Sequence, residues 1–409
     1  MKINKWTVAL AAAGLVSLPA VGQAEEKPNQ VLTALQGTTI SGYVDTSAQW
    51  NFGTGNLNLP QYKFGGSDKA DGFNLNVIQL RIEKPMDETE WAAGYRADLW
   101  FGPDANTLAT TSGQSDSDSN SDFAIRQAYV TLRVPVLGNG LDFKIGVFDN
   151  PNGYESVASP DNPNYTRSYG HSLEPQTLTG IAMSHRWADW IASTLGVANT
   201  TGPGINSRAF QTDSSEGSNY KAESYKTYFS QLELTAPESM GFLSGSTLYF
   251  GTVNGYNSNL ASVAYNNGGD SDIGNTQNFY VGLTMNTPVK DLKVGVAYDY
   301  LKVHNSDNDA KAIGLYASYQ CTPKLGLHLR GEYANSDVYQ TASGYDIENA
   351  KIIDLTATVQ YDLWANVISR LELRWDHSAN GQDIFGEGSE GEPNLKNAWM
   401  LAANIIYKF

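Results

Sequence analysis

The sequence has 409 residues, and its 43 acidic and 27 basic side chains give a formal net charge of −16. This acidic balance argues against nucleic acid as a partner, and the single cysteine, Cys321, excludes an intrachain disulfide. We interpret Cys321 as an incidental strand residue rather than a catalytic thiol. The 23 tyrosines, 9 tryptophans and 39 glycines, with a charged fraction of only 17%, favour an all-β protein whose strands meet lipid on one face.

The amino terminus has the pattern of an export signal. Two lysines without an acid precede the apolar run 6–18, and the small-residue ending Gly22-Gln23-Ala24 follows it. This pattern predicts a signal peptide over residues 1–24 that is cleaved on export. The apolar run is too short for a transmembrane helix, and no later segment approaches the roughly eighteen apolar residues that one needs. Residues 25–37 are expected to form a short periplasmic segment of one or two helical turns.

From residue 38 onward the chain shows the period-two pattern of β-strands. Apolar residues from Trp399 to Phe409 alternate with polar or small ones, and 141–147 and 325–330 repeat the pattern. A soluble β-sandwich shows the same alternation, so the pattern alone does not decide the fold class. We predict about sixteen strands, each near the length that a tilted membrane strand needs. Their ranges are 38–50, 72–84, 90–101, 123–134, 140–149, 177–187, 190–199, 223–236, 244–255, 276–287, 291–303, 310–320, 325–336, 350–362, 366–377 and 397–409.

The connections between these strands favour a membrane barrel over a sandwich. Short turns such as 85–89, 135–139 and 288–290 alternate with long loops. Short periplasmic turns and long extracellular loops are the signature of a transmembrane antiparallel β-barrel. The loop after Val303 is a short exception, and fourteen or eighteen strands also fit the sequence. We expect residues 38–409 to form one closed sheet, because closure leaves no unpaired strand edge in hydrocarbon.

Several motifs carry a family resemblance. From Gly146 the sequence runs G-V-F-D-N-P-N-G-Y-E, followed by N-Y-T-R-S at 164–168, and the first strand contains I-S-G-Y-V-D-T-S at 40–47. With Q-A-Y-V-T-L at 127–132 and the aromatic carboxy terminus, the chain resembles the β-barrel porin-2, OmpL-like family over nearly its whole mature length. The resemblance implies an outer-membrane channel and says little about its solute. It implies no catalytic residue, and it suggests as pore-loop residues only Pro151, Gly153, Tyr154 and Glu155.

The longest outer loop, 150–176, follows the fifth strand, where general porins of similar strand number fold a loop inward. Pro151 and Gly153 would set its bend, and its acids outnumber its one arginine. We interpret it as a constriction loop that faces a basic wall across the lumen. The alternative is a loop packed outside the pore as a lid. The candidate constriction residues are Pro151, Gly153, Tyr154, Glu155, Asp161, Arg167 and Glu174.

The polar faces of the strands carry charges of both signs, which indicates a mixed-charge lumen. A barrel of about sixteen strands is wide enough to hold water, so these charges need no tight pairing. We expect most of them to form ion-pair ladders along the wall and a few to border the solute path. The basic positions are Arg81, Arg96, Arg133, Lys144, Arg186, Arg330, Arg370 and Arg374, and the acidic ones are Glu83, Asp98, Asp142, Glu332, Asp354, Glu372 and Asp376.

Aromatic residues near the predicted strand ends fit the interface girdles of a membrane barrel. Phe409 resembles the recognition signal of the outer-membrane assembly machinery, and we assign it that role. Trp100 is the one tryptophan that we place inside on a strand, so support for a sugar-specific pore is weak. The girdle residues are Trp50, Trp91, Phe101, Trp375, Trp399 and Tyr407.

Two other kinds of site fit the sequence poorly. The run from Asp116 to Asp122 begins like a calcium loop, but Ser121 and Gln127 stand where an EF-hand needs glycine and glutamate. We interpret it as a hydrated loop, with no metal site. The five histidines are accompanied by neither a G-x-S-x-G elbow nor an H-E-x-x-H motif. We therefore expect no enzymatic activity and no cofactor.

These observations favour a water-filled diffusion channel for small hydrophilic solutes or ions in the outer membrane of a Gram-negative bacterium. The predicted outer loops 104–122, 256–275, 337–349 and 378–395 contain acids but no Lys or Arg, and they predict a mild cation preference. The competing hypothesis is a structural or adhesion barrel with an occluded lumen, and a sugar-specific porin is a further alternative. The expected partners are outer-membrane lipid and lipopolysaccharide, the barrel-assembly machinery and small solutes. A homotrimer is left open, because general porins are often trimers.

Overall fold

The computed structural model describes residues 37–53, 55–62, 69–87, 89–108, 110, 121–209, 212–213, 218–219, 225–256, 275–303, 308–341 and 344–409. The predicted signal peptide, residues 25–36 of the predicted periplasmic segment and most of the calcium-like run lie outside these residues. Thr39–Phe409 form one compact unit. None of the helices described here is both long and apolar enough to cross a bilayer.

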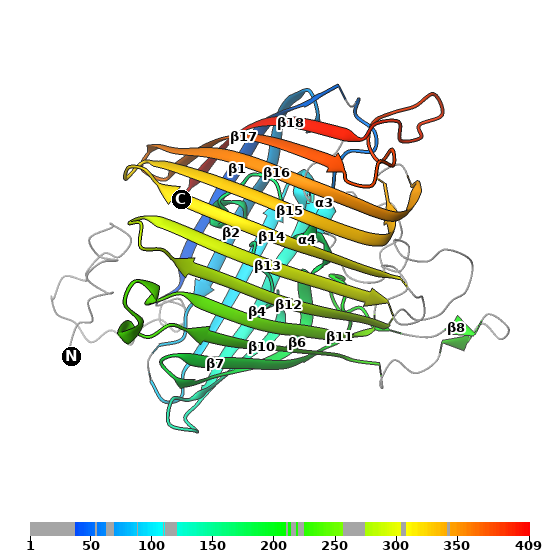
Figure 1. Cartoon of the computed structure of the whole chain (residues 1–409). Coiled ribbons are helices and arrows are strands. Elements are labelled where there is room, and N and C mark those ends of the chain that lie inside the picture. The colour runs from blue at the N-terminus through cyan, green and yellow to red at the C-terminus, as the bar shows by residue number, and fades with distance from the viewer. Residues whose placement is uncertain are drawn as a thin grey trace. The chain divides into compact units, whose positions relative to one another are not determined.

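The unit is a closed antiparallel barrel of sixteen strands, which confirms the predicted fold class (Figure 1). Each strand pairs with its neighbours in the chain, and a two-stranded ribbon of β8 (Thr212–Asp213) and β9 (Ser218–Asn219) lies in the connection between β7 and β10. The barrel strands are β1 (Thr39–Phe52), β2 (Gly72–Lys84), β3 (Ala93–Phe101), β4 (Phe123–Val134), β5 (Leu141–Asp149), β6 (Thr177–Ala188), β7 (Ile191–Ala198), β10 (Thr227–Thr235), β11 (Thr247–Tyr256), β12 (Asn275–Asn286), β13 (Leu292–Val303), β14 (Asp309–Gln320), β15 (Leu325–Gln340), β16 (Asp346–Trp364), β17 (Val367–Ser378) and β18 (Asn397–Lys408).

The barrel closes where its first and last strands meet. β1 pairs with β18 in an antiparallel register that places Tyr43 opposite Lys408. The Gly42 N–H donates to the Phe409 carbonyl at 2.9 Å, and the Phe409 N–H donates to the Gly42 carbonyl at 3.0 Å. Closure gives every strand two neighbours, so the backbone needs no hydrogen bond from lipid.

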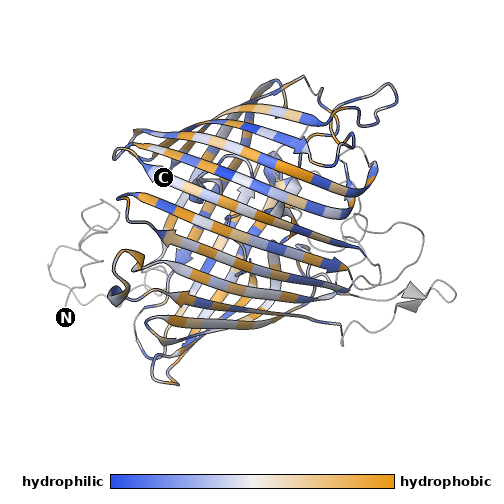
Figure 2. Ribbon diagram, viewed as in Figure 1, coloured by the Kyte–Doolittle hydropathy of each residue, from blue (hydrophilic) through white to orange (hydrophobic). Residues whose placement is uncertain are grey.

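Side chains alternate across the wall as the period-two pattern predicts. On β17, Leu371 and Leu373 are 52% and 44% exposed on the outer face, whereas Glu372 and Arg374, which alternate with them, are fully buried inside. Hydrophobic and hydrophilic bands alternate along the strands in Figure 2. An apolar outer face and a polar inner face are what a barrel in a membrane requires.

The longest connections lie at one end of the barrel, although two connections at that end, 304–308 and 341–345, are short. The connections 189–190, 321–324 and 365–366 are short, and those between β5 and β6 and between β17 and β18 are long. One predicted outer loop, 337–349, is wrong, because β15 and β16 continue through it and Gln340 pairs with Asp346. The reason is local packing, since Tyr339 and Ile347 on this extension contact the buried Phe385 cluster.

Short helices occupy some connections. α3 (Pro103–Leu108) follows β3, and η3 (Glu238–Leu243) lies in the connection between β10 and β11. The loop between β5 and β6 contains the 3-10 turn η2 (Ser159–Asp161) and α4 (Tyr169–Leu173). α4 contacts β13, β14 and β15, and Figure 1 shows it behind this part of the wall. These elements bring the loop against the inner face of the barrel.

Candidate functional site

The loop 150–176 first meets the wall at β10 and β11. Asn152 donates to the Ser230 carbonyl at 3.2 Å, and the Gln231 side chain donates to the Pro151 carbonyl. Gly251 on β11 faces Asn152 so closely that a Cβ atom there would overlap the amide of Asn152. The glycine therefore leaves the space that this part of the loop occupies.

The next residues continue along the inner wall. The Tyr154 ring stacks on the Tyr316 ring of β14, with the centroids 4.1 Å apart. Gly153 has a φ of 132°, and a Cβ atom at this position would collide with the carboxylate of Glu174. The first part of the loop, 150–157, thus approaches the last part, 171–176, at Gly153. A cavity of about 220 Å³ lies between these two parts.

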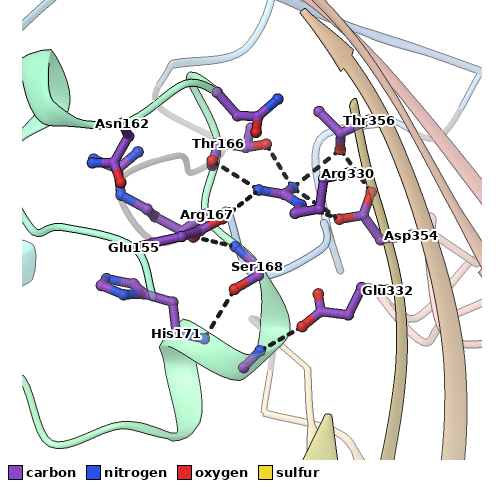
Figure 3. A network of polar contacts seen from close by, with 12 residues as sticks. Glu155, Asn162, Thr166, Arg167, Ser168, His171, Arg330, Glu332, Asp354 and Thr356 are labelled. Carbon is purple, nitrogen blue, oxygen red and sulfur yellow. Dashed lines mark hydrogen bonds and ion pairs between the residues drawn. The ribbon is translucent and has the colours of Figure 1, made fainter. Parts of the chain in front are cut away.

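A buried arginine joins the middle of the loop to β15. Arg330 donates to Glu155 of the loop at 3.1 Å, to Asp354 of β16 at 2.8 Å and to the Thr166 carbonyl at 3.0 Å. Figure 3 shows its guanidinium reaching from the strand into this network. The side chains of Arg330, Glu155 and Asp354 are at most 2% exposed. Such a fully hydrogen-bonded buried network fixes geometry, because removing one member leaves a charge without its partner.

Charged wall residues also satisfy the backbone of the loop. Glu372 accepts hydrogen bonds from the Tyr165 and Thr166 N–H groups at 2.6 and 2.9 Å. Arg370 donates to the carbonyls of Ser159 and Asn162 at 3.1 and 2.5 Å. These bonds matter because the loop lacks the ladder of a sheet and its buried backbone groups still need partners.

Arg167 stabilises the loop itself. Its guanidinium donates to the carbonyls of Ser156 and Tyr165 at 3.0 and 2.9 Å, and its own carbonyl accepts from Arg374 at 2.7 Å. Burial lowers the pKa of Arg167, and the nearby Glu155 opposes this effect. Arg167 is therefore enclosed within the loop rather than presented to the lumen.

The carboxy-terminal part of the loop forms hydrogen bonds with an acid of the wall. The N–H groups of Tyr169 and Gly170 donate to Glu332 at 2.6 and 2.7 Å. Burial, and next the proximity of Asp299, raise the pKa of Glu174 well above its ordinary value. Glu155 and Glu174 are thus buried in contacts, whereas Asp161 on η2 is exposed. The structure places the loop acids that we predicted in two different environments.

The predicted wall charges also divide into two groups. Arg330 and Arg374 on β15 and β17 have fully buried side chains beneath the loop, and Arg370 is 4% exposed. On β2, β3 and β4, the side chains of Arg81, Arg96 and Arg133 are 23%, 22% and 29% exposed. Lys144 on β5 is also partly exposed. Arg186 lies apart, exposed near the end of β6, where it donates to the Asp189 carbonyl. The accessible charge among these residues therefore lies on the β2–β5 side.

Asp98 connects the charges of this accessible wall. One of its partners is Arg126, which the sequence pattern did not place in the lumen. Asp98 accepts hydrogen bonds from Arg81 at 2.9 Å, Arg96 at 2.7 Å and Arg126 at 3.0 Å. Strict alternation would place Arg126 on the lipid face. A register shift between Asp98 and Leu99 inserts an extra residue in β4, so that Arg126 and Gln127 both face inward.

Two further segments enter the lumen, although no pattern in the sequence predicted that they would. Ala105 and Leu108 of α3 pack in a buried cluster with Trp100, which lies inside the barrel as predicted. Asp104 forms a buried ion pair with Lys69; burial raises the pKa of Asp104 to about 7, and Lys69 opposes the shift. Tyr62 from the β1–β2 loop lies against Arg374, with the guanidinium carbon 5.0 Å from the ring centroid.

A last loop covers the outer end of the buried side. Ile384 and Phe385, between β17 and β18, are fully buried against Tyr339 and Ile352 of the extended hairpin. Asn58 donates to the carbonyls of Gly386 and Gly391 at 2.8 and 2.9 Å. The β15–β18 side is therefore filled by three loops that contact one another or the same wall.

A closed sixteen-stranded barrel with an apolar outer face and a charged, loop-lined interior defines the class of outer-membrane porin-like channel proteins. The comparisons agree with this class. The chain belongs to the β-barrel porin-2, OmpL-like family, whose pattern matches residues 37–409. The family resemblance seen in the sequence is thereby confirmed. No curated protein sequence matches the chain.

Solved porin structures share the fold at low sequence identity. The outer membrane channel DcaP of Acinetobacter baumannii is 15% identical with a TM-score of 0.57, over 91% of this chain and 97% of that one. The anion-selective porin of Comamonas acidovorans is 12% identical with a TM-score of 0.56, over 91% and 99%. OmpT of Vibrio cholerae, in its trimer form, is 12% identical with a TM-score of 0.54, over 91% and 99%. At these identities the similarity concerns the fold alone.

Proposed function

We propose that this protein is a water-filled diffusion channel for small hydrophilic solutes or ions in the Gram-negative outer membrane. The observation that carries the proposal is the uneven burial of the lumen charges. Arg330 and Arg374 are covered by loops, whereas Arg81, Arg96 and Arg133 keep about a quarter of their side-chain surface accessible. Ionised groups remain charged at moderate cost only where water reaches them. The solute path therefore follows the β2–β5 side.

The loop 150–176 acts in this proposal as the constriction. It occupies the lumen beside β10–β17 and reduces a wide barrel to a narrower path along the opposite wall. Selection then depends on size and on the charges that border the path. Tyr154 and Glu155 set the loop against the wall, and the exposed Asp161 is the acid of this loop that meets the solution.

A mild cation preference in dilute salt belongs to the same proposal. Asp383, Glu387 and Glu390 are exposed in the loop between β17 and β18, and this loop contains no Lys or Arg from 379 to 395. Fixed negative charge at the mouth concentrates cations. The wall arginines oppose this effect, and the Comamonas porin of the same fold is anion-selective. We propose that the mouth dominates when salt screens it least.

The competing function is a structural or adhesion barrel with an occluded lumen. The packing of three loops against β15–β18 supports this alternative, since Phe385 and Arg374 are fully buried there. A sugar-specific pore is supported less, because Trp100 is enclosed by α3 rather than exposed to the path. Neither function needs a catalytic step or a cofactor, and no cluster of His, Cys, Asp and Glu suited to a metal ion occurs among the described residues.

The proposed setting is the outer membrane, which the family and the fold support. Residues 1–24 act as an export signal, the assembly machinery recognises the strand that ends at Phe409, and lipid and lipopolysaccharide surround the apolar outer face. A homotrimer is proposed because OmpT of Vibrio cholerae, which shares the fold, has been solved as a trimer. The oligomeric state is measured by crosslinking in native membranes.

Planar-bilayer recording tests the channel against the occluded barrel. The folded mature protein is expected to give discrete conductance steps. A variant in which residues 157–166 are replaced by a short Gly-Ser linker is expected to give larger steps and to pass larger neutral solutes, because the segment that contacts Arg370 and Glu372 is gone. Folded protein that gives no steps favours the occluded barrel. Equal conductance in both proteins contradicts the constriction.

A further inference from the structure

We propose that Lys144 on β5 forms a subsite for small organic anions that carry one carboxylate group. The inference rests on the proposed channel function and specifies one class of solute for it. Lys144 lies on the inner face of the accessible wall, between Thr131 of β4 and Ala182 of β6 in the sheet register. Its neighbours across the strands are thus a hydroxyl and a methyl group rather than acids.

Lys144 differs from most of the wall arginines in its lack of an acidic partner. Among the residues that the structure describes, no carboxylate oxygen lies within 4.0 Å of its ammonium nitrogen. The two acids of its own strand are already engaged, since Asp142 accepts from Arg133 at 2.7 Å and Asp149 pairs with Arg126. Arg81, Arg96, Arg330 and Arg374 each pair with a carboxylate as well.

Arg370 shows why the missing partner is informative. It too has no acid within ion-pair distance among the described residues, but it donates to Gln360 and to the carbonyls of Ser159 and Asn162. Its donors are therefore used by the loop. In the described part of the wall the ammonium of Lys144 donates to no comparable acceptor, so its donors remain available to water or to a solute.

The surroundings of Lys144 strengthen its field. The ammonium lies 4.8 Å from the centroid of the Tyr129 ring and 5.8 Å from that of Phe148. Phe148 belongs to a buried apolar cluster with Leu178 and Phe229 on the same inner wall. A charge at the edge of an apolar cluster is screened less than one surrounded by water. The aromatic contacts hold the ammonium in place but supply no hydrogen-bond acceptor of the carboxylate kind.

This arrangement selects a particular kind of anion. One ammonium balances one negative charge, which matches a monocarboxylate better than a doubly charged phosphate. The half-buried Tyr129 borders the site and offers an apolar edge to the organic part of the solute. A carboxylate would replace water on the free donors of Lys144 in a charge-assisted hydrogen bond.

The test is the block of single-channel potassium chloride current by benzoate, with the folded mature protein in a planar bilayer. Benzoate is expected to cause brief, concentration-dependent interruptions. Lys144→Gln is expected to weaken this block roughly ten-fold, as the loss of one charge-assisted hydrogen bond implies. Lys144→Arg should retain most of it. The control Lys293→Gln removes the same charge from an exposed position on β13 and should leave the block unchanged.

The outcomes separate the two proposals. A conducting channel in which Lys144→Gln and wild type are blocked equally overturns the subsite and leaves the channel intact. Equal weakening in Lys144→Gln and Lys293→Gln also overturns it, because net charge alone then explains the effect. Phosphate that blocks as well as benzoate overturns the monocarboxylate assignment. Folded wild-type protein that passes no current overturns the channel function, and the subsite with it.

Discussion

The Arg330 guanidinium donates a 3.1 Å hydrogen bond to the Glu155 carboxylate, and this bond connects β15 to the loop 150–176 across the inside of the barrel. Both side chains are nearly inaccessible, and Arg330 holds Asp354 of β16 at the same time. The position of the loop therefore depends on a buried ion pair that salt in the lumen screens only weakly.

Glu155→Gln should loosen the loop without releasing it. The amide keeps the shape of the side chain but loses the charge, while Arg330 keeps its 2.8 Å contact to Asp354. We expect a free energy of unfolding lower by about 1–3 kcal/mol and noisier, larger single-channel currents, because a buried charged hydrogen bond is weakened. Urea unfolding in detergent and bilayer recording measure the two effects.

Asp161→Asn provides the matched control for this prediction. It makes the same change of charge in the same loop, but at an exposed residue without a partner in the wall network. Its stability should stay within experimental error of wild type. If the two variants give indistinguishable currents, the Arg330–Glu155 contact does not control the width of the path.

Deletion of Phe409 should reduce the amount of folded protein in the outer membrane. The deletion removes both backbone hydrogen bonds that join Phe409 to Gly42 at the seam of the barrel. Phe409→Ala keeps these bonds and removes the aromatic ring. We expect the deletion to weaken the band of folded protein on unboiled gels of outer-membrane fractions. The reason is that a closed barrel resists denaturation only while its seam is intact.

The alanine variant distinguishes two roles of Phe409. If the ring is the signal read by the assembly machinery, Phe409→Ala should insert as poorly as the deletion. If only the seam matters, it should insert as wild type does. Wild-type levels in both variants would contradict any role of Phe409 in assembly.

The fold was predictable because its signals are local. Alternation along β17 and the length of the connections depend only on neighbouring residues. Both patterns predicted the closed barrel of sixteen strands that the structure shows. Arg126 was not predictable, because a bulge in β4 opposite Asp98 reverses the alternation and no residue type in β4 marks it. The burial of Glu155 and Tyr62 depends on partners from β15 and β17, far away in the chain. A period-two pattern contains no information about which loop fills the lumen.

Asp104 should make the protein less stable as the pH rises from about 4 to about 7. Burial raises the pKa of Asp104 from its ordinary value of 3.8 to about 7, so the folded state holds a proton that the unfolded state has released in this range. The contribution is complete below the unfolded pKa and is lost as the pH rises through the folded pKa. Urea unfolding in detergent micelles between pH 4 and pH 8 measures the slope.

Asp104→Asn should flatten this slope. The absolute stability of the variant is a poor measure, because Lys69 loses its buried partner at the same time. The pH dependence is the informative quantity, and Asp161→Asn should retain the wild-type slope, since Asp161 is exposed. An unchanged slope in Asp104→Asn would assign the effect to other buried acids such as Glu174, whose pKa is also raised by burial.

Ion selectivity should change with salt because its two sources differ in position. Asp346, Asp383, Glu387 and Glu390 are exposed at the outer end, whereas Arg81, Arg96 and Arg133 are partly exposed on the inner wall and are already paired. Charges at the mouth act over about one Debye length, roughly 8 Å at physiological ionic strength and less in concentrated salt.

We therefore expect the reversal potential across a potassium chloride gradient to indicate a mild cation preference in dilute salt that fades in concentrated salt. The double variant Glu387→Gln/Glu390→Gln should lose most of the preference in dilute salt and match wild type in concentrated salt, because it removes only charges at the mouth. Lys144→Gln should act in the opposite direction and increase the preference, since it removes a positive charge from the wall that no described acid neutralises. An anion-selective reversal potential of wild type in dilute salt would assign control to the inner wall and leave the barrel and its channel function unaffected.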